Sequence, residues 1–588
     1  MDSKHVTEST SGQEDIQKTW WKEAIIYQIY PRSFQDSDDD GIGDLNGITS
    51  RLDYIQSLGV DIIWLNPIFL SPNDDNGYDI SDYREIMREF GTMEDFDRLL
   101  KEIHKREMRL VLDLVVNHTS DEHPWFEEAR KSRHNPYYNY YHWWPAEKGE
   151  PPLRLSYFDE EGNAWTYNKP TDSYYLHYFS RKQPDLNWEN PEVRQEIFDM
   201  MRFWFDKGID GFRMDSISLI AKDPSFPLID SKKYPDIFSF YAKEPRLHLY
   251  LHEMNRQVLS KYDCMSVGEG SAVMVDDVAK FVDPAREELN MLYHFDAARI
   301  RNTTLPDNPE SGIDYSLIAL KKMFTEWDKA VDKGWPSIYL GNHDQPRMVS
   351  RFGSDKDEFR ALSAKMLITF LLTMRGTPYW FAGDEIGMRN IRFDHIEDYN
   401  DIDTINRYKK AKAEGKDPQA VLDEQKETGR DNARTPFQWD RSPEAGFTAG
   451  TPWLKVNPDY TWINVADEEK DPTSILNYFK KVVSFRKENP SLIYGSYHLL
   501  DAENPQCYTF LRKTGADTYL IMLNFSPKAA ISTPGIDMSN AHVLLDNYGD
   551  RSHMAPQKDI TLRPFEAIVF QLNHPVYESF IDSLDLLE

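Results

Sequence analysis

Short runs of apolar and β-branched residues recur along the first part of the chain, and stretches with helical spacing separate them. Eight such runs occupy residues 24–30, 61–65, 109–116, 211–215, 264–269, 291–296, 336–344 and 377–385. Runs that are apolar at nearly every position are typical of parallel strands that helices cover on both faces. Eight strands in alternation with helices predict an α/β fold, the TIM or (β/α)8 barrel.

Two regions depart from this alternation. Residues 119–186, between the third and fourth runs, form a connection too long for an ordinary strand-to-helix loop, which predicts an inserted subdomain. Near residue 497 the pattern becomes alternating and rich in turns, which predicts an antiparallel β domain. The expected parts are a polar tail at 1–19, the barrel at 20–118 and 187–496, the insert at 119–186 and the C-terminal domain at 497–588.

The chain is strongly acidic. Asp and Glu total 98 against 68 Lys and Arg, and the formal net charge is −30 at pH 7. Nucleic acids and anionic membranes bind basic surfaces, so we expect neither as a partner. The charge favours a small neutral molecule as the binding partner, and it leaves the oligomeric state open.

We expect neither a targeting segment nor a membrane-spanning helix. Residues 1–19 are polar, and the apolar stretch at 367–374 is far shorter than the roughly 20 residues that a spanning helix needs. Cys264 and Cys507 fall in different predicted domains, so reduced thiols are expected rather than a disulfide. These features predict a cytoplasmic protein.

Several of the apolar runs end on a carboxylate, and three of these acids are the catalytic candidates. These residues are Asp215, Glu269 and Asp344. A (β/α)8 barrel builds its active site at the C-terminal ends of its strands, and two carboxylates that flank one bond are what glycoside hydrolysis requires. One acid at a strand end can equally cap the helix that follows it, but three in series favour catalysis over capping.

The segments around these acids carry a family resemblance. DLVVNH (113–118), QPDLNW (183–188), GFRMD (211–215), VGE (267–269) and NHDQPR (342–347) resemble the ordered signature regions of the α-amylase superfamily, glycoside hydrolase family 13. From Trp20 onward the chain is also similar to the subgroup of oligo-1,6-glucosidases, α-glucosidases and sucrose isomerases. The resemblance implies a retaining, exo-acting α-glucosidase that hydrolyses terminal α-glucosyl residues of short oligosaccharides or disaccharides without an organic cofactor.

The resemblance also implies a role for each acid. Asp215 is expected to be the nucleophile that forms a covalent glucosyl-enzyme, and Arg213, on the same strand face, to keep it ionised. Glu269 is expected to act first as general acid and then as general base. Asp344 is expected to bind ring hydroxyls and to stabilise the oxocarbenium-like transition state.

Further residues are expected around the sugar. Histidines at strand ends pair with the acids and suit recognition of hydroxyls, and the remaining positions resemble the pocket that encloses the non-reducing glucose in exo-acting members. The residues are Asp75, Tyr78, His118, Phe179, Gln183, His343 and Arg430. Arg434 is either part of this cluster or a structural ion pair.

The loop DSDDDGIGD, residues 36–44, presents acids at alternating positions with a glycine at the turn. Such oxygen ligands suit a structural Ca2+, and the corresponding loop of the family binds a cation. The expected ligands are the side chains of Asp36, Asp38, Asp40 and Asp44 and the carbonyl of Ile42. The alternative is a solvated acidic turn without an ion.

Two other functions are compatible with the same motifs. Sucrose isomerases of the subgroup hold fructose with an arginine-rich stretch; here Arg299 matches its first arginine, but Asn302 stands where the second is expected. Ser216, directly after the nucleophile, leans away from strict α-1,6 preference, while sucrose and its isomers stay credible substrates. Non-catalytic sugar-binding or scaffold relatives typically lose an acid and carry a spanning segment, whereas this chain keeps all three acids.

Overall fold

The structure is a computed structural model that describes residues 18–158, 162–234, 236–303, 306–515, 517–552 and 557–572. Most of the predicted polar tail and the last part of the predicted C-terminal domain lie outside the described residues.

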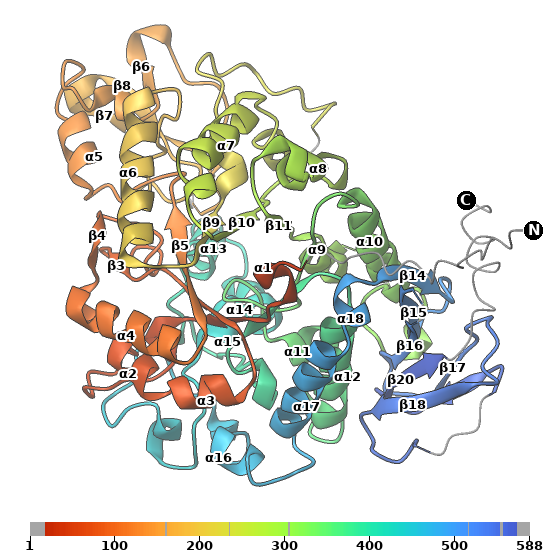
Figure 1. Ribbon diagram of the computed structural model, residues 1–588. Helices are drawn as coiled ribbons and strands as arrows, with labels where there is room; N and C mark the ends of the chain where they lie inside the picture. Colours follow the sequence, from red (N-terminus) through yellow and green to blue (C-terminus); the bar gives the residue numbers. More distant parts are fainter. Residues whose placement is uncertain are drawn as a thin grey trace, which may run out of the picture.

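Eight parallel strands form the centre of the molecule (Figure 1). In chain order they are β1 (Ile26–Ile29), β2 (Ile62–Leu65), β5 (Arg109–Val115), β9 (Gly211–Asp215), β10 (Met265–Glu269), β11 (Met291–Tyr293), β12 (Ser337–Ile338) and β13 (Thr377–Phe381). Their order in the sheet is β11-β10-β9-β5-β2-β1-β13-β12, and each falls within one of the predicted runs. The predicted TIM barrel is therefore confirmed.

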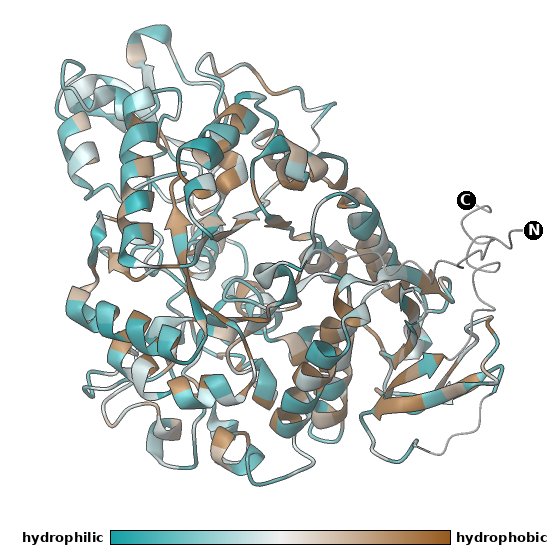
Figure 2. Ribbon diagram, viewed as in Figure 1, coloured by the Kyte–Doolittle hydropathy of each residue, from teal (hydrophilic) through white to brown (hydrophobic). Residues whose placement is uncertain are grey.

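The barrel is nearly closed. The strands at the two ends of the sheet order, β11 and β12, are not paired with each other. The Ser337 hydroxyl on β12 nevertheless donates to the carbonyl oxygen of Leu292 on β11 at 3.0 Å. The strands are brown in Figure 2, whereas the outer faces of many surrounding helices are teal. This distribution matches parallel strands that are covered on both faces.

Helices follow the strands around the barrel. They are α2 (Leu45–Ser50), α3 (Leu52–Ser57), α4 (Met93–Lys105), α6 (Pro191–Lys207), α7 (Arg246–Gln257), α8 (Ala279–Val282), α9 (Asp296–Thr303), α10 (Leu317–Ala330), α11 (Met348–Phe352), α12 (Arg360–Thr373) and α17 (Ile475–Glu488). Helix α4 shows why the sequence folds this way: Thr92 and Asp95 form a capping box, and Phe96, Leu99 and Ile103 repeat at helical spacing and are buried.

Shorter helices and a long excursion after β13 complete this part. They are α1 (Trp20–Glu23), α13 (Ile402–Ala413), α14 (Pro418–Thr428), α15 (Asp431–Arg434), α16 (Val465–Glu468) and α18 (Ser491–Tyr494). Helices α13 and α14 lie in contact with each other, and the chain returns through α15. This excursion carries the predicted pocket residue Arg430 back to the barrel.

A small antiparallel sheet is inserted between β5 and β9. It consists of β6 (Trp143–Pro145), β8 (Ser173–Leu176) and β7 (Trp165–Asn168) in the order β6-β8-β7, with α5 (Pro124–Ala129) preceding it. Strands β3 (Phe69–Leu70) and β4 (Asp82–Ile86) pair separately after β2. In Figure 1 the inserted sheet extends from the barrel at the upper left.

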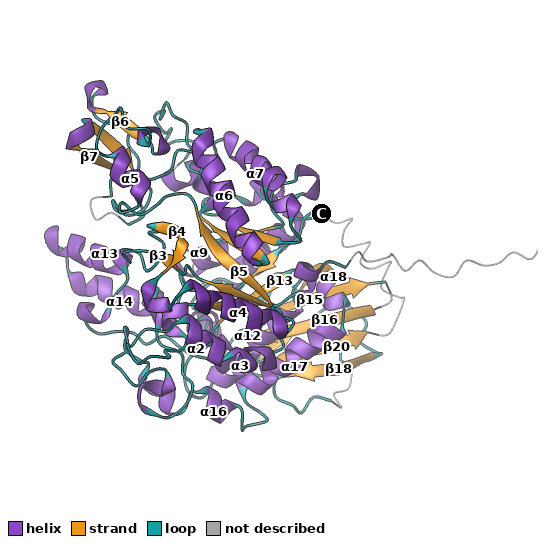
Figure 3. Cartoon of the chain, turned by 60° about the vertical axis from the view of Figure 1, so that its left-hand side comes forward, coloured by secondary structure: helices purple, strands orange, loops and turns teal. Residues whose placement is uncertain are grey.

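The C-terminal part is an antiparallel sheet of five strands, as predicted. It contains β14 (Ser496–Leu500), β15 (Cys507–Thr514), β16 (Asp517–Asn524), β20 (Ala567–Leu572) and β18 (Ala541–Asp546), in that order, and β17 (Ala530–Ser532) pairs with β19 (Ile560–Leu562) beside it. The five strands run side by side in Figure 3. The buried Arg512 donates to the carbonyl oxygens of Thr373 and Leu492 at 2.6 and 2.8 Å, which fixes this sheet to the barrel helices.

None of the helices within the described residues combines the length and the apolar character needed to cross a membrane.

Candidate active site

A cavity of about 250 Å³ opens at the C-terminal ends of the barrel strands. Eight of the predicted site residues line it: Asp75, Tyr78, His118, Phe179, Asp215, Glu269, Asp344 and Arg430. The other three, Gln183, Arg213 and His343, are fully buried directly behind its wall. The structure thus brings the three strand-end acids and all predicted sugar-binding residues together.

One guanidinium group holds the two central carboxylates. Arg213, on β9 and fully buried, donates from Nη1 to Asp215 Oδ1 at 2.7 Å and from Nη2 to Glu269 Oε2 at 2.8 Å. Nη1 also donates to Asp113 Oδ1 on β5 at 2.7 Å, and Nε donates to the Tyr293 hydroxyl on β11 at 2.7 Å. Four neighbouring strands are therefore tied to one cation, which places the Asp215 and Glu269 side chains on the same side of the cavity.

The residue after Asp215 has a strained backbone. Ser216 has φ 42° and ψ 31°, in the left-handed region that non-glycine residues seldom adopt. This turn aims its backbone N–H at Glu269 Oε2, which accepts the hydrogen bond at 2.8 Å. The strain therefore serves to fix the carboxyl group of Glu269 beside that of Asp215.

Glu269 and Asp344 have opposite proton affinities. Burial, followed by the charges of Asp215 and Asp344, raises the pKa of Glu269 well above its ordinary value. Burial alone would also raise the pKa of Asp344, but His343 and the guanidinium groups of Arg430 and Arg434 hold it well below its ordinary value. An acid with a raised pKa thus stands beside one with a lowered pKa, as acid catalysis at a charged transition state requires.

Two arginines from the excursion after β13 reach Asp344. Arg434 donates from Nη2 to Asp344 Oδ1 at 2.9 Å and from Nε to the carbonyl oxygen of His343 at 2.9 Å. Arg430 donates from Nη1 to the same Asp344 oxygen at 3.2 Å and from Nη2 to Asp75 Oδ1 at 3.4 Å. Arg434, which the sequence left open, is thus a buried partner of the Asp344 carboxylate, and Arg430 closes the far wall of the cavity.

His343 belongs to a hydrogen-bonded chain that reaches the floor of the cavity. The Gln28 amide donates to its Nδ1 at 2.8 Å, so the ring proton lies on Nε2, which faces the Tyr78 hydroxyl at 2.7 Å and Asp344 Oδ2 at 3.1 Å. Tyr78 donates in turn to Asp113 Oδ2 at 3.0 Å. Burial lowers the pKa of His343 well below its ordinary value, so it acts as a neutral hydrogen-bond donor.

The insert supplies one wall of the cavity. Gln183 donates to Asp75 Oδ2 at 3.2 Å and lies 3.2 Å from His118 Nε2. The ring of Phe179 packs against the rings of His118 and Tyr157, with centroid separations of 5.1 Å in both cases. Burial raises the pKa of Asp75 to about 7 despite the opposing charge of Arg430, so its protonation changes near neutral pH.

Several residues at the site were missed by the sequence analysis. Asp113 left a signal, because it is a lone carboxylate inside an apolar strand, where an unpaired charge is costly. Asp401 is fully buried against Arg430, but the sequence held no signal for it. The sequence likewise held no signal for the residues that complete the cavity mouth. The latter are Tyr157, Phe158, Ser271, Ala272 and Phe295.

Two residues that the sequence analysis linked to isomerisation or to linkage preference line the cavity. Arg299 lines it together with Phe295 and Ser271. Ser216, the residue associated with linkage preference, lies on the cavity wall. The side chain of Asn302 lies outside the described part of the chain.

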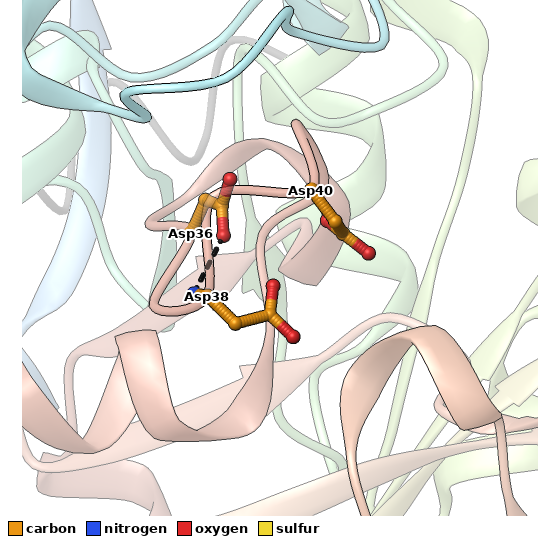
Figure 4. Close-up of side chains that lie close together, drawn as sticks. All are labelled: Asp36, Asp38 and Asp40. Carbon is orange, nitrogen blue, oxygen red and sulfur yellow. Dashed lines mark hydrogen bonds between the residues drawn. The ribbon is translucent and has the colours of Figure 1, made fainter.

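The acidic loop lies after β1, and its residues are not among those that line the cavity. The side chains of Asp36, Asp38 and Asp40 lie close together (Figure 4). The side chains of Asp36, Asp38 and Asp40 each offer an oxygen within 4.8 Å of the others. Asp44 is engaged elsewhere, because its carboxylate caps α2 by accepting from Gly47 N at 2.7 Å and also accepts from Ser37 N at 2.7 Å.

Within this loop, backbone N–H groups satisfy the Asp36 carboxylate. Asp38, Asp39 and Gly41 all donate to it, at 3.0, 2.9 and 2.8 Å. The Ile42 N–H donates to Asp40 Oδ1 at 2.8 Å. Among the described residues no lysine or arginine forms an ion pair with the three clustered acids.

Comparison with known proteins gives consistent matches over nearly the whole chain. The family model described as alpha amylase, catalytic domain, matches residues 28–495. An oligo-1,6-glucosidase of Parageobacillus thermoglucosidasius is 51% identical over 571 residues, which cover 95% of this chain and 100% of that protein.

Solved structures of a trehalulose synthase and an isomaltulose synthase are also similar. A trehalulose synthase variant with Tris aligns with a TM-score of 0.90 at 43% identity, covering 94% of this chain and 100% of its own. The isomaltulose synthase of Protaminobacter rubrum aligns with a TM-score of 0.89 at 42% identity, covering 95% and 100%.

Proposed function

Because the chain belongs to the α-amylase family of glycoside hydrolases, we propose that its cavity removes single α-glucosyl residues from short oligosaccharides or disaccharides with retention of configuration. The observation that carries this proposal is the sharing of Arg213 between Asp215 and Glu269. A shared guanidinium keeps two carboxyl groups close enough to act on one glycosidic bond, the arrangement typical of retaining enzymes.

In the first step Asp215 attacks the anomeric carbon of the bound glucosyl unit. Arg213 orients this carboxylate, since Nη1 donates to its Oδ1. Glu269 gives its proton to the glycosidic oxygen as the bond to the leaving sugar breaks, and its raised pKa favours the protonated form that this step needs. The products of this step are a glucosyl-enzyme ester, the released sugar and ionised Glu269.

In the second step water replaces the released sugar. Glu269, now anionic, removes a proton from the water as its oxygen attacks the anomeric carbon, and the bond to Asp215 breaks. Each step inverts the configuration at the anomeric carbon, so the double displacement retains it. The enzyme returns to its starting protonation state.

Asp344 and its neighbours hold the sugar. Asp344 stays ionised and accepts from ring hydroxyls, which stabilises positive charge that develops at the anomeric carbon. Gln183 and Arg430 both donate to Asp75 at the cavity wall, and we expect this cluster to close one end of the cavity around a terminal glucose. Exo-action follows from this closed end.

The decisive experiment is incubation with sucrose, maltose and isomaltose followed by separation of the products. We expect glucose to be released from at least one of them, initially as the α-anomer, with the two products of each cleavage in equal amounts. Initial release of β-glucose would contradict retention. An intact chain that cleaves none of the three would contradict the assignment to short α-glucosides.

Sucrose isomerisation is the second candidate. It is favoured by the similarity to trehalulose and isomaltulose synthases and by Arg299 at the cavity mouth. An isomerase must retain fructose long enough to compete with water, which needs several donors, and Asn302 replaces one expected arginine. A missing donor is worth about 1–3 kcal/mol, so we expect hydrolysis to exceed isomerisation by roughly tenfold or more. Isomers as the main product of sucrose would reverse this choice.

A structural Ca2+ at the acidic loop is a further part of the proposal. Three carboxylates offer oxygens within 4.8 Å of one another, which suits an oxygen-preferring cation. Burial and then neighbouring acids raise the pKa of Asp38 and of Asp40, as expected where charges crowd without a cation. Asp44 and the Ile42 carbonyl stay predicted ligands. The ion would supply no group to the reaction, because the loop lines no part of the cavity.

The expected partner is a neutral α-glucoside. The family and the cavity support this substrate class, and the net charge of −30 disfavours nucleic acid. A cytoplasmic location stays a prediction from the sequence.

A further inference from the structure

Arg430 is held from behind by a carboxylate that lines no part of the cavity. Asp401 Oδ1 faces Nε and Nη2 of Arg430 at 2.7 and 2.5 Å. The contacts of Arg430 with the cavity carboxylates are longer, 3.2 Å to Asp344 and 3.4 Å to Asp75. Hydrogen bonds weaken with distance, so Asp401 has the strongest hold on the guanidinium group.

Asp401 is itself fixed in place. It is fully buried and is the N-cap of α13, where its Oδ2 accepts from Thr404 N at 3.0 Å and from the Thr404 hydroxyl at 2.7 Å. Its own backbone N–H donates at 2.9 Å to Oδ2 of Asp431, the residue that follows Arg430. The two carboxylate oxygens thus have separate tasks, one toward the helix and one toward the arginine.

Asp401 is an anion despite its burial. Burial would raise its pKa, but the charges of Arg430 and Arg434 and the bonds from Thr404 hold it below the ordinary value. Among the charges around Arg430, Asp401 does most to raise the pKa of that guanidinium. The pair is therefore a buried ion pair, and the loss of either partner leaves the other only its longer contacts, those of Arg430 with Asp344 and Asp75 or that of Asp401 with Arg434.

We propose that Asp401 is a positioning residue that keeps the Arg430 guanidinium back from Asp344 and Asp75, so that their oxygens accept sugar hydroxyls. A carboxylate oxygen that already accepts arginine N–H groups has fewer lone pairs for a ligand. Without the Asp401 charge, the nearest remaining anions for Arg430 are the two cavity carboxylates, and closer pairing with them competes with the sugar. The inference rests on the proposed function in one respect, since it takes the cavity to be the sugar site.

The primary test compares Asp401→Asn with the wild-type chain. Asparagine keeps the size and the capping oxygen but has no charge. We expect the dissociation constant for glucose, measured by calorimetry, to rise about tenfold, and kcat/KM for an aryl α-glucoside to fall at least about tenfold. Asp401→Ser, which caps a helix equally well, should do the same and decides the matter should the asparagine variant not fold.

The matched control is Asp417→Asn. Asp417 caps α14 on the same excursion by accepting from Gln419 N at 2.9 Å, and it is exposed. Loss of a cap charge there should leave both glucose binding and kcat/KM within about twofold of wild type, in line with the small energies of exposed helix caps.

A double-mutant cycle separates positioning from a general effect on folding. If Asp401 acts through Arg430, then Asp401→Asn should change kcat/KM by less than about twofold in an Arg430→Met background. An equal loss in both backgrounds, or near-wild-type glucose binding by Asp401→Asn, would overturn the proposal. Because the glucose titration does not depend on turnover, failure of the α-glucosidase assignment is seen separately, as a wild-type chain that cleaves no α-glucoside.

Discussion

Carboxylates gather in two regions of this chain, and the two regions compensate them differently. At the strand ends, Asp215, Glu269 and Asp344 are held by guanidinium groups from β9 and from the excursion after β13. In the loop after β1, Asp36 and Asp40 accept from backbone N–H groups of the same loop, with no ion pair to the cluster among the described residues. Residue type alone does not distinguish them.

The difference teaches what each region can do. At the strand ends, burial and neighbouring acids raise the pKa of Glu269 against the opposing charge of Arg213, whereas His343, Arg430 and Arg434 lower the pKa of Asp344 despite its burial. Local N–H groups instead fix the shape of a loop and leave the exposed side chains of Asp38 and Asp40 facing solvent. The first arrangement suits covalent catalysis, and the second suits binding of an ion.

The largest expected effect is on turnover, which should depend on the strand-end acids and not on the acidic loop. Asp215→Asn or Glu269→Gln should lower turnover by several orders of magnitude, about 5 kcal/mol or more of transition-state stabilisation, because each removes a group that acts only in the reaction. Melting curves should show an intact fold. Asp40→Asn in the acidic loop is the control and should leave turnover near wild type; substantial turnover in either strand-end variant would remove its assigned role.

The next effect tests the shared guanidinium. Arg213→Met leaves Asp113, Asp215 and Glu269 without their common cation, so we expect turnover to be lost and unfolding to become easier by about 3–5 kcal/mol. Denaturant unfolding measures the stability. The exposed Arg98, replaced by Met, is the control and should cost less than about 1 kcal/mol. A similar small cost at both arginines would contradict the central position given to Arg213.

Chelation tests the acidic loop alone. If Ca2+ binds Asp36, Asp38 and Asp40, a chelator should lower the melting temperature by several degrees, and added Ca2+ should restore it, since a ligand of the folded state stabilises it by mass action. Activity per folded molecule should hardly change. A variant with both Asp38→Asn and Asp40→Asn should no longer respond to chelator, and a wild-type melting curve that ignores chelator would leave only a solvated turn.

The smallest expected effect concerns how stability changes with pH: the contributions of Glu269 and Asp36 to the free energy of unfolding should change in opposite directions. Glu269 has a raised pKa, so the folded chain keeps a proton that the unfolded chain has released, and this contribution to stability is lost as pH rises above the ordinary value of 4.5. Asp36 has a lowered pKa, because hydrogen bonds from Thr448 and from its own loop outweigh burial, so its contribution is lost as pH falls below 3.8.

Melting temperatures across pH measure both contributions. The stability of Glu269→Gln relative to wild type should increase as pH rises from about 5 to 8. The deficit of Asp36→Asn should be full at neutral pH and should shrink as pH falls toward about 3. Parallel pH curves for both variants would show that the two regions are not compensated differently.

The local pattern of apolar and polar residues predicts much of the fold. Each of the eight apolar runs became a barrel strand, because continuous burial leaves little room for polar positions, as in β2 and β13, where every residue is buried. The ends of those runs located Asp215, Glu269 and Asp344, because the C-terminal ends of parallel strands meet at one face of the barrel. Their being brought together at one cavity was predictable for this reason.

Other features depended on contacts between segments far apart in the chain. Asp44, in the same acidic loop as Asp36, is by contrast engaged locally, because its oxygens accept from the N–H groups of Gly47 and Ser37. Asp401 gave no sign of a role, since its partner Arg430 lies 29 positions away and only folding of the excursion brings them together. Local pattern specifies burial and direction, whereas the partner of a buried charge depends on which segments pack against it.

The sequence by itself therefore determined the barrel, the antiparallel C-terminal sheet and the three acids at the strand ends, because burial periodicity and strand polarity are local properties. Tertiary structure alone decided that Arg213 serves three carboxylates at once, that Ser216 takes a left-handed turn toward Glu269, and that the pKa of Glu269 is raised. Proton affinity is the sum of burial and nearby charge, and both quantities exist only once distant segments have packed together.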